Sequence, residues 1–456
     1  MKESFSKNTL LWLVAIGFFM ETLDSTIVNT ALPTMAHDLG VSPFEMQSVV
    51  VSYALTLAVF IPASGWLTDR FGIRRVYLSA ILIFTFGSLL CALAPTLSSL
   101  VIARIIQAAG GSMLLPVGRL AVLRTFPGER YLPALSFVTM PALIGPLIGP
   151  TLGGLIAEKL SWHWIFLVNI PIGILGCFAT YKAMPADDYI RKRSFDYVGF
   201  LQMALFMVCV SLALEGVTFN RISSTIGYVL FIFGIAALAA YVIRALKNPN
   251  PLISLKLFET RTFSIGILGN IFSRLGSTSI TFLLPLFMQL CLGLSPLNSG
   301  MAMLPIAIAA IMGKRLVSPL VRIFGYKKFL IMNTFLVGTT IASFTLINTS
   351  EAGHLRLSLF SLFGVFNSMQ FTAMNTLTMK DLGREVSSHG NTLFSIVQMM
   401  AMSFSVGIAG SLIQTLMEER SKIEAFHLTF ICMGALTWTS AWIFFQIGRD
   451  KRLNPS

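Results

Sequence analysis

Long runs of apolar residues dominate this chain and limit the folds open to it. Hydrophobic residues make up 55% of its 456 residues and charged residues only 12%, which is about half the charged share of a soluble domain. A run of about 20 apolar residues is long enough to cross a bilayer as a helix. Fourteen such runs occur, at 10–32, 46–67, 76–95, 98–122, 131–157, 162–183, 197–217, 225–246, 262–290, 297–317, 328–348, 354–379, 390–416 and 426–447. The sequence therefore predicts an all-α polytopic membrane protein.

The distribution of positive charge orients these spans. The net charge is +13, and the Lys and Arg residues gather in loops on one side, such as 69–75 and 322–328. Cytoplasmic loops carry such an excess, whereas a nucleic-acid-binding protein would present a basic face. An even number of spans puts both termini on one side, and Lys2 and Arg449 place that side in the cytoplasm. We expect a multi-pass protein of the inner (plasma) membrane with both termini inside.

Two similar loops indicate an internal repeat. DRFGIRR at 69–75 resembles RIFGYKK at 322–328, and Gly72 matches Gly325. The repeat predicts two six-helix halves with two extra helices between them. Repeated halves with a binding site at their interface are typical of secondary transporters.

The repeat also predicts the domain boundaries, which are an N-terminal half at 1–183, inserted spans and linkers at 184–261, and a C-terminal half at 262–456. The inserted segments 197–217 and 225–246 are each apolar enough to span, although one re-entrant unit is the alternative.

The first span carries two carboxylates, in the stretch ETLDSTIVNTALP. At 1.5 Å per residue, Glu21 lies about 16 Å and Asp24 about 21 Å in from Leu10. A charge near the bilayer centre costs roughly 2.5–3.5 kcal/mol on insertion scales, so such residues usually mark a pathway or a relay. The two residues share one helix face. We expect both to take part in proton coupling, with Glu21, nearer the midplane, also contacting a cationic substrate.

An arginine in the fourth span lies at a matching depth. Arg104 is about 10 Å in from Leu97, and Asp24 is about 12 Å in from Leu32. A buried arginine is best paired by a carboxylate, which it can bind with two parallel hydrogen bonds. We predict that Arg104 lies close to the face of Glu21 and Asp24 and takes part in proton coupling. A purely structural ion pair is the alternative.

Two stretches resemble signatures of the major facilitator superfamily. GWLTDRFGIRR, between the second and third spans, resembles a loop whose aspartate latches the two halves on the cytoplasmic side. The resemblance gives this gating role to Asp69 and its neighbours Gly65, Arg70, Gly72 and Arg74. RIIQAAGGSM resembles a fourth-helix motif implicated in proton transfer. Its matching residues are Arg104, Gln107, Gly110 and Gly111, whereas Ala108 replaces a glycine.

A third stretch, PALIGPLIGPTLGG, carries glycines spaced by four. Gly145, Gly149 and Gly153 clear one helix face for close approach, and Pro146 and Pro150 each remove a backbone hydrogen bond. Helix packing alone would explain this pattern. The stretch, which ends at Gly154, also resembles a gating motif that accompanies antiporters in this superfamily. Ser136 stands where the motif has an earlier glycine.

Two further runs resemble one branch of the superfamily. LDSTIVNTALP in the first span and WHWIFLVNIPIG in the sixth resemble the fourteen-span drug:proton antiporters of the EmrB/QacA type. This resemblance implies a major facilitator fold of two six-helix halves plus two central helices. It also implies a proton-coupled antiporter that exports small amphipathic molecules or drugs by alternating access.

Polar residues within the spans predict a substrate cavity. Arg274 lies about 18 Å into its span from Thr262, and Asn270 and Asn375 are further polar residues of the second half. The alternative for each uncharged residue is a hydrogen bond between helices, worth about 0.6 kcal/mol. The predicted cavity residues are Glu21, Gln107, Asn270, Arg274, Gln289, Asn367, Gln370 and Gln398.

Several function classes find no support. The chain lacks a phosphate-binding glycine loop, a His/Cys metal cluster and a nucleophile elbow, so we expect no enzyme activity, cofactor or metal. The expected partners are a small-molecule substrate, protons and the lipid bilayer, and an accessory periplasmic adaptor is left open.

One alternative is an exporter of a specific metabolite or siderophore-like anion that binds Arg274 and Arg104. A membrane-embedded acyltransferase is disfavoured by the scattered histidines, and an uptake symporter only by the glycine motif.

Overall fold

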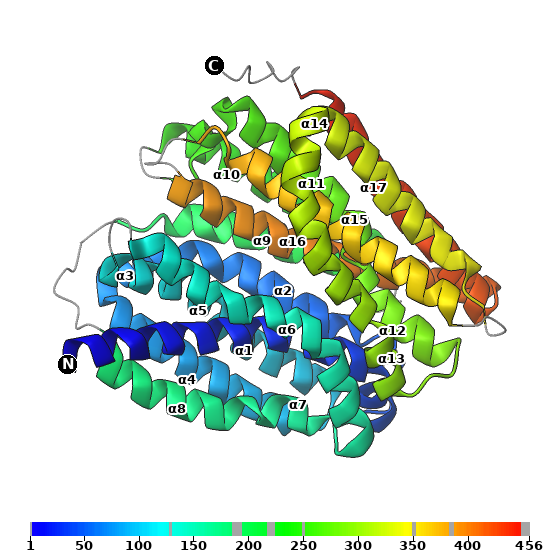
Figure 1. Ribbon diagram of the computed structural model, residues 1–456, viewed down its shortest axis with the longest axis horizontal. Coiled ribbons are helices and arrows are strands. Elements are labelled where there is room, and N and C mark those ends of the chain that lie inside the picture. Colours follow the sequence, from blue (N-terminus) through cyan, green and yellow to red (C-terminus); the bar gives the residue numbers. More distant parts are fainter. Residues whose placement is uncertain are drawn as a thin grey trace. The chain divides into compact units, whose positions relative to one another are not determined.

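The protein is helical throughout the part described by this computed structural model (Figure 1), which covers residues 2–126, 130–184, 194–216, 224–248, 251–348, 353–382 and 387–447. No strand occurs within these ranges. Thirteen of their helices are long and apolar enough to cross a membrane. One of them, Pro296–Leu346, has 51 residues and covers two of the predicted spans. The predicted all-α membrane fold is confirmed.

The chain divides into two compact units, which are Met1–Leu252 with Leu294–Met301, and Ile253–Gly293 with Ala302–Ser456. The helices of the first unit are α1 (Lys2–Asp38), α2 (Gln47–Phe60), η1 (Ile61–Ala63), α3 (Ser64–Phe71), α4 (Ile73–Ala92), α5 (Leu97–Thr125), α6 (Tyr131–Lys159), α7 (His163–Leu167), α8 (Asn169–Ala183), α9 (Tyr197–Gly216), α10 (Ser224–Lys247) and nearly all of α13 (Pro296–Ala302). The second unit contains η3 (Leu255–Glu259), α11 (Arg261–Ser277), α12 (Ile280–Leu290), α14 (Leu304–Ser343), η4 (Phe344–Leu346), α15 (His354–Met379), α16 (Ser387–Glu419) and α17 (Lys422–Phe445).

Helix α1 lies at the centre of the first unit, where it packs against α5, α6 and α8 (Figure 1). Its apolar side chains Val14 and Phe18 are fully buried and join Tyr77 and Phe84 of α4 in one core. The polar residues of the same helix must therefore find partners inside this unit, because they cannot reach water.

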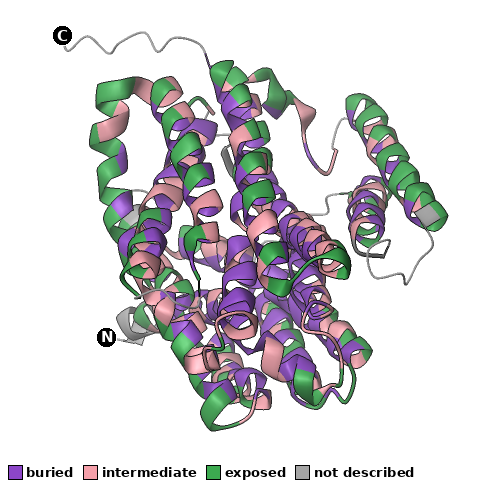
Figure 2. Ribbon diagram, turned by 90° about the vertical axis from the view of Figure 1, so that its right-hand side faces the viewer, coloured by how far each residue is buried: buried purple, intermediate pink, exposed green. Residues whose placement is uncertain are grey.

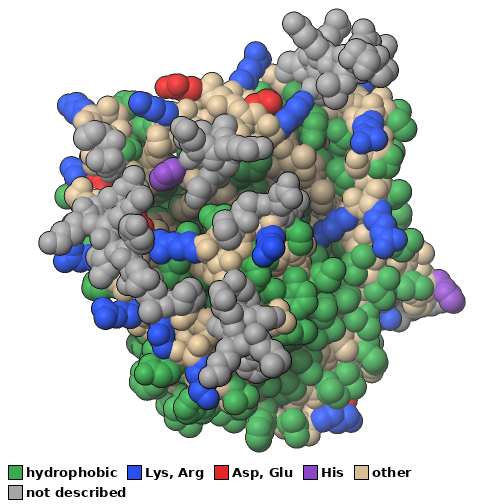
Figure 3. Space-filling model, turned by 60° about the vertical axis from the view of Figure 1, so that its left-hand side comes forward, with side chains coloured by type: hydrophobic (Ala, Val, Ile, Leu, Met, Phe, Trp, Pro, Cys, Tyr) green, Lys and Arg blue, Asp and Glu red, His purple; other side chains and the backbone are tan. Residues whose placement is uncertain are grey.

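In the second unit, α14 packs against α15 and α17, and α11 packs against α15, α16 and α17. Phe329 and Leu330 of α14, Met374 of α15 and Phe444 of α17 are almost wholly buried in its core. Large hydrophobic side chains remain exposed on both units. Figure 2 shows the exposed residues in green, and Figure 3 shows broad green areas of hydrophobic side chains. Such surfaces suit contact with lipid.

Several predicted spans are interrupted, and two of these breaks have a clear local cause. The span at 46–67 changes from α2 to the short 3-10 helix η1, where Pro62 has no N–H to donate. The span at 262–290 breaks between α11 and α12. There the hydroxyls of Ser277 and Ser279 donate to the backbone oxygens of Ser273 and Gly276, at 2.9 and 2.8 Å, and such bonds compete with regular helix geometry.

The two matched glycines have the same backbone conformation. Gly72 has φ 88° and ψ 156°, and Gly325 has φ 72° and ψ 158°. Side chains other than hydrogen disfavour positive φ, so glycine suits both corners. Gly325 breaks the long α14 at a kink, so the predicted spans 297–317 and 328–348 lie on the two sides of this kink. The predicted match between the two loops is confirmed.

The inserted segments form α9 and α10, of 20 and 24 residues, and these helices pack on each other. Each is long enough to span, which favours two spans over one re-entrant unit. Before α9, the buried Asp196 accepts hydrogen bonds from Arg244 Nε at 2.8 Å, Gly199 N at 3.0 Å and Leu252 N at 3.4 Å. This carboxylate ties the start of α9 to the end of α10 and to the chain beyond it.

Replacing Asp196 by Asn should destabilise the protein by about 1.5–3 kcal/mol, the value of hydrogen bonds to a charged group. Burial raises the pKa of Asp196, but the hydrogen bonds from Arg244 and Gly199 outweigh burial and hold the pKa below its usual value. The stabilising contribution should therefore be full above the usual carboxyl pKa and disappear as the pH falls through the lowered pKa.

The measurement is the melting temperature of the detergent-solubilised protein and of Asp196→Asn from about pH 7 down to about pH 3. The two melting temperatures should differ at neutral pH and converge in acid. Glu259→Gln, which changes an exposed carboxylate, serves as the control. A difference that is constant with pH would contradict the prediction.

Candidate functional site

The site is built around Asp24, on the middle of α1. The hydroxyls beside it are satisfied within the helix, since Thr22 Oγ1 donates to Phe18 O at 2.9 Å and Ser25 Oγ donates to Thr22 O at 2.8 Å. The Asp24 carboxylate cannot bond in this way, because it has no proton to donate when ionised. It is 1% exposed and depends on donors from other helices.

Three side chains from two other helices supply these donors. Arg104 Nη1 of α5 donates to Asp24 Oδ2 at 2.6 Å. Gln107 Nε2, one turn further along α5, donates to Asp24 Oδ1 at 2.8 Å, and Asn169 Nδ2 at the start of α8 donates to the same oxygen at 3.1 Å. The predicted proximity of Arg104 and Asp24 is confirmed, whereas their role in proton coupling stays a prediction.

A second ring of polar groups holds these donors in place. Ser88 Oγ of α4 accepts from Gln107 Nε2 at 2.9 Å and from Asn169 Nδ2 at 3.4 Å, and it donates to Phe84 O at 2.8 Å. Gln107 Oε1 accepts from Arg104 Nη1 at 2.7 Å. Four helices of the first unit are thus joined in one hydrogen-bonded network.

Aromatic rings enclose the arginine. The Cζ atom of Arg104 lies 3.9 Å from the ring centroid of Tyr53 and 5.7 Å from that of Phe166. The residue is 1% exposed, so the pair with Asp24 is shielded from water. Separating a buried ion pair by removing one partner costs roughly 3–5 kcal/mol, because the remaining charge is left uncompensated.

Glu21 lies one turn before Asp24 and is 4% exposed. The charged groups close enough to interact electrostatically with the Glu21 carboxylate are Asp24 and Arg119. Within the described part of the chain, no donor forms a hydrogen bond to its carboxylate. The two acids of α1 therefore differ sharply, since Asp24 is fully bonded and Glu21 is not.

The glycine stripe of α6 allows α1 to pack closely beside this network. A Cβ atom on Gly145 would lie 2.6 Å from Thr22 Oγ1, and one on Gly153 would lie 3.2 Å from Ile27 Cγ1 and closer still to the Ile27 backbone oxygen. A Cβ atom on Gly149 would meet Thr26. The predicted close approach is confirmed, and the helix that it meets is the one carrying Asp24.

The end of α6 packs on α13. A Cβ atom on Gly154 would lie 2.7 Å from the Pro296 carbonyl carbon, and Thr151 Oγ1 donates to Gly300 O at 3.2 Å. Glu158 Oε2 accepts from Leu297 N at 3.1 Å, near the start of α13. Pro146 is exposed and Pro150 partly exposed within α6.

The residues assigned to the cytoplasmic latch lie in α3 and at the start of α4. Gly65 is exposed, Asp69 is partly exposed, and Asp69 makes no ion pair with any described side chain. The Cζ atom of Arg70 lies over the Trp66 ring, 5.8 Å from the ring centroid, and Arg74 donates to the Tyr181 backbone oxygen. The latch role of Asp69 stays a prediction.

The predicted cavity residues of the second unit have different surroundings. Gln370 is fully buried and bonds to Asn333 and Thr334 of α14, at 2.8 and 2.7 Å, which favours the alternative of a hydrogen bond between helices. Arg274 Nε donates to Asn270 Oδ1 at 3.3 Å, since residues four apart share one helix face. The partly exposed residues are Asn367 on α15, Gln289 on α12 and Gln398 on α16.

Sequence reasoning missed Asn169 and Ser88 as members of the network. Asn169 is a polar residue within an apolar run, and this signal could have identified it. Ser88 carries no comparable signal, because a serine in a membrane helix often bonds only to its own backbone. Gln107 was expected to line a cavity, but its amide is fully used by Asp24, Arg104 and Ser88.

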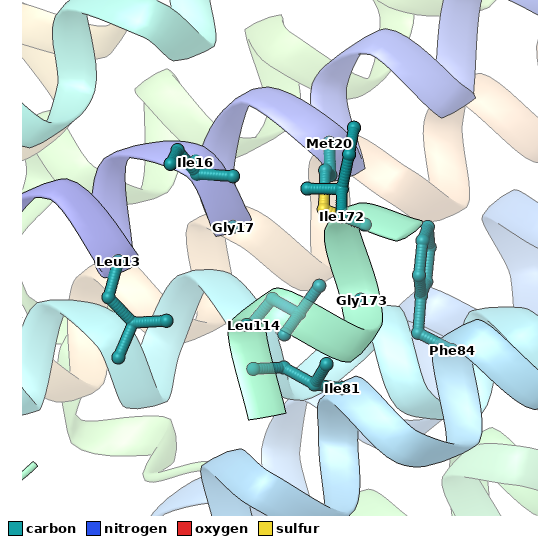
Figure 4. A pocket seen from close by; sticks show the side chains of 10 residues that line it. Leu13, Ile16, Gly17, Met20, Ile81, Phe84, Leu114, Ile172 and Gly173 are labelled. Carbon is teal, nitrogen blue, oxygen red and sulfur yellow. The ribbon is translucent and has the colours of Figure 1, made fainter. Parts of the chain in front are cut away.

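A small cavity lies near this network, between α1, α4, α5 and α8 (Figure 4). Leu13, Met20, Ile81 and Leu114 are among its lining residues, and its volume is about 20 Å³. A cavity of this size has room for about one water molecule, whereas ligand pockets measure roughly 300–1,000 Å³. It is therefore too small and too apolar for an amphipathic substrate.

The described side chains include no group of His, Cys, Asp and Glu suited to a metal ion.

Comparison with known proteins agrees with the fold. The profile of the Major Facilitator Superfamily matches residues 14–406. The chain belongs to this superfamily.

Similar sequences cover its whole length. The "Putative multidrug resistance protein MdtD" of Serratia proteamaculans (strain 568) is 44% identical over 462 residues, which cover 100% of this chain and 96% of that protein. The protein of the same name from Salmonella typhimurium is 44% identical over 452 residues, which cover 97% and 96% of the two chains.

Solved structures resemble the fold at low sequence identity. A D-xylose-proton symporter matches with a TM-score of 0.70 and 14% identity, covering 96% of this chain and 97% of the symporter. A POT family transporter in complex with 5-aminolevulinic acid matches with a TM-score of 0.72 and 14% identity, covering 95% and 94%. These likenesses support the fold alone.

Proposed function

We propose that this protein is a proton-coupled antiporter of the inner membrane that exports small amphipathic molecules by alternating access. The observation that carries the proposal is the buried pair of Asp24 and Arg104, with 2.6 Å between Nη1 and Oδ2. Ionisable groups inside membrane helices usually serve transport. The relatives named multidrug resistance proteins support export of drug-like molecules, and the positive charge of the loops supports cytoplasmic termini.

In this proposal Asp24 is the proton carrier. Protonation removes the charge that holds Arg104, Gln107 and Asn169, so the network can open. Arg104 then favours release of the proton, because its positive charge stabilises the ionised carboxylate. Glu21, which has no hydrogen-bond donor among the described residues, is left to contact a cationic substrate.

The glycine-rich helix α6 and the loop around Asp69 would gate the cycle. The first supports α1 directly, so a movement of α6 relative to α1 would reach Asp24. The second is rich in positive charge and lies outside the apolar spans. These roles rest on the resemblance of both stretches to superfamily motifs and on the packing of α6 against α1.

The test is transport by the purified full-length protein in proteoliposomes with an imposed pH gradient. Ethidium is a suitable probe because it is cationic and amphipathic. We expect ethidium to move against its own gradient, in the direction opposite to the protons, and to stop when an ionophore collapses the pH gradient. Ethidium transport that is unchanged by the ionophore would contradict proton coupling.

A further inference from the structure

Arg274 of α11 is a charged residue within a predicted span that the proton site leaves unexplained. None of the six predicted spans of the second half, from 262–290 to 426–447, contains Asp or Glu. Arg274 makes no ion pair with any side chain that the structure describes. A charge within a membrane segment is costly without a partner. The carboxylate that pairs with Arg104 in the first unit thus has no counterpart around Arg274.

The surroundings of Arg274 hold its side chain but leave most of its donors unused. Its Cζ atom lies 3.9 Å from the ring centroid of Phe371, and Nε donates to Asn270 Oδ1 at 3.3 Å. Asn270 is fixed in turn, since its Nδ2 donates to Gly266 O at 2.9 Å. A guanidinium has five N–H donors, so the four on the two terminal nitrogens remain. The residue is partly exposed, so these donors are accessible.

Further unpaired polar groups lie on α15, which packs against α11. Asn367, Phe371 and Asn375 follow one another at intervals of four residues and share one helix face. The Oδ1 atoms of Asn367 and Asn375 are buried without a partner. Neither amide forms a hydrogen bond within the described residues. The face that contacts Arg274 therefore carries two more side chains with free N–H groups.

The helix also breaks close to this point. Helix α11 ends at Ser277 and α12 begins at Ile280, one turn beyond Arg274, and the hydroxyl of Thr278 is buried without a partner. Interrupted helices are common at the substrate sites of secondary transporters. The unused donors and the break thus coincide in one place.

We propose that Arg274, with Asn367 and Asn375, forms a subsite that binds the carboxylate of a small organic anion. The planar guanidinium matches the two oxygens of a carboxylate, and the Phe371 ring beneath its Cζ atom helps to hold it in place. This inference rests on the proposed transport function and names the substrate class for it. The transported molecules then include organic anions besides cations.

The experiment compares three probes of the same size that differ in charge, namely 1-naphthoate, 1-naphthamide and 1-naphthylmethylamine. Binding to the full-length protein is measured by calorimetry in nanodiscs of phosphatidylcholine, so that no anionic lipid competes. We expect 1-naphthoate to bind about tenfold to a hundredfold more tightly than 1-naphthamide, as for hydrogen bonds to a charged group. Equal binding of these two probes, or no binding of 1-naphthoate, would overturn the proposal.

Arg274→Gln should lower the affinity for 1-naphthoate to that for 1-naphthamide and leave the affinity for 1-naphthamide unchanged. Arg315→Gln removes an exposed arginine of the same unit and should change neither. The melting temperature of detergent-solubilised Arg274→Gln should not fall below that of the unmodified protein, which shows that the variant is folded. An equal loss of affinity for both probes would indicate a structural role and reject the subsite. Failure of the unmodified protein to transport ethidium would instead reject the proposed function, and the comparison of probes would still stand.

Discussion

Asp24→Asn should abolish ethidium transport driven by a pH gradient, reducing it to the level of liposomes without protein. Asparagine has nearly the same size as aspartate and can still accept a hydrogen bond from Arg104. It cannot take up and release a proton, so the cycle loses the group that the proposal makes the carrier. The measurement is the accumulation of ethidium in proteoliposomes with an imposed pH gradient.

Asp38→Asn is the matched control, since Asp38 is an exposed residue at the end of the same helix. This variant should transport like the unmodified protein. Asp24→Asn leaves Arg104 without a counter-charge. The double variant Asp24→Asn with Arg104→Gln should therefore be more stable than Asp24→Asn alone, and it should remain inactive in transport. Transport by Asp24→Asn at the normal rate would reject Asp24 as the carrier.

The second large effect is expected from Gly153→Ala on α6. The added methyl group would meet the backbone oxygen of Ile27 on α1, and a backbone cannot rotate away as a side chain can. Overpacking of this kind costs roughly 1–3 kcal/mol. We expect a lower melting temperature together with slower proton-driven transport, because α1 must shift and Asp24 shifts with it.

Gly176→Ala on α8 provides the comparison for this variant. A Cβ atom on Gly176 would make ordinary contacts of 3.5 and 3.7 Å with Ile81 side-chain atoms, and alanine favours a helix over glycine by about 1 kcal/mol. Its melting temperature should therefore stay level or rise. If Gly153→Ala were as stable as Gly176→Ala, the contact between α6 and α1 would be looser than the structure shows.

The helices and the central ion pair could be predicted from the sequence for simple physical reasons. Apolar runs of the right length specify membrane helices, and the depths of Asp24 and Arg104 follow from a constant rise per residue. Matching depths were enough to predict the pair because few charges occur in the spans. The match between Gly72 and Gly325 could be predicted because both stand in similar basic loops, whereas their shared backbone conformation is known only from the structure.

The remaining partners of Asp24 could not be predicted in this way. Ser88 and Asn169 meet Asp24 because α4 and α8 are rotated to bring them there, and this rotation depends on packing over the whole unit. The uncharged candidates show the same limit. The sequence places Gln370 and Asn367 on one helix, but only the packing shows that Gln370 is used by α14 whereas the amide of Asn367 is unpaired among the described residues.

The pair of Asp24 and Arg104 has a consequence for leakage. A pH difference of one unit supplies about 1.4 kcal/mol per proton, whereas separating a buried pair costs roughly 3–5 kcal/mol. A stray proton therefore meets a barrier that slows its entry by about a hundredfold to several thousandfold, at tenfold for each 1.36 kcal/mol. The energy spent in separating Asp24 from Arg104 is recovered when the pair re-forms. The closed pair would therefore limit proton leak and preserve the proton gradient between transport cycles.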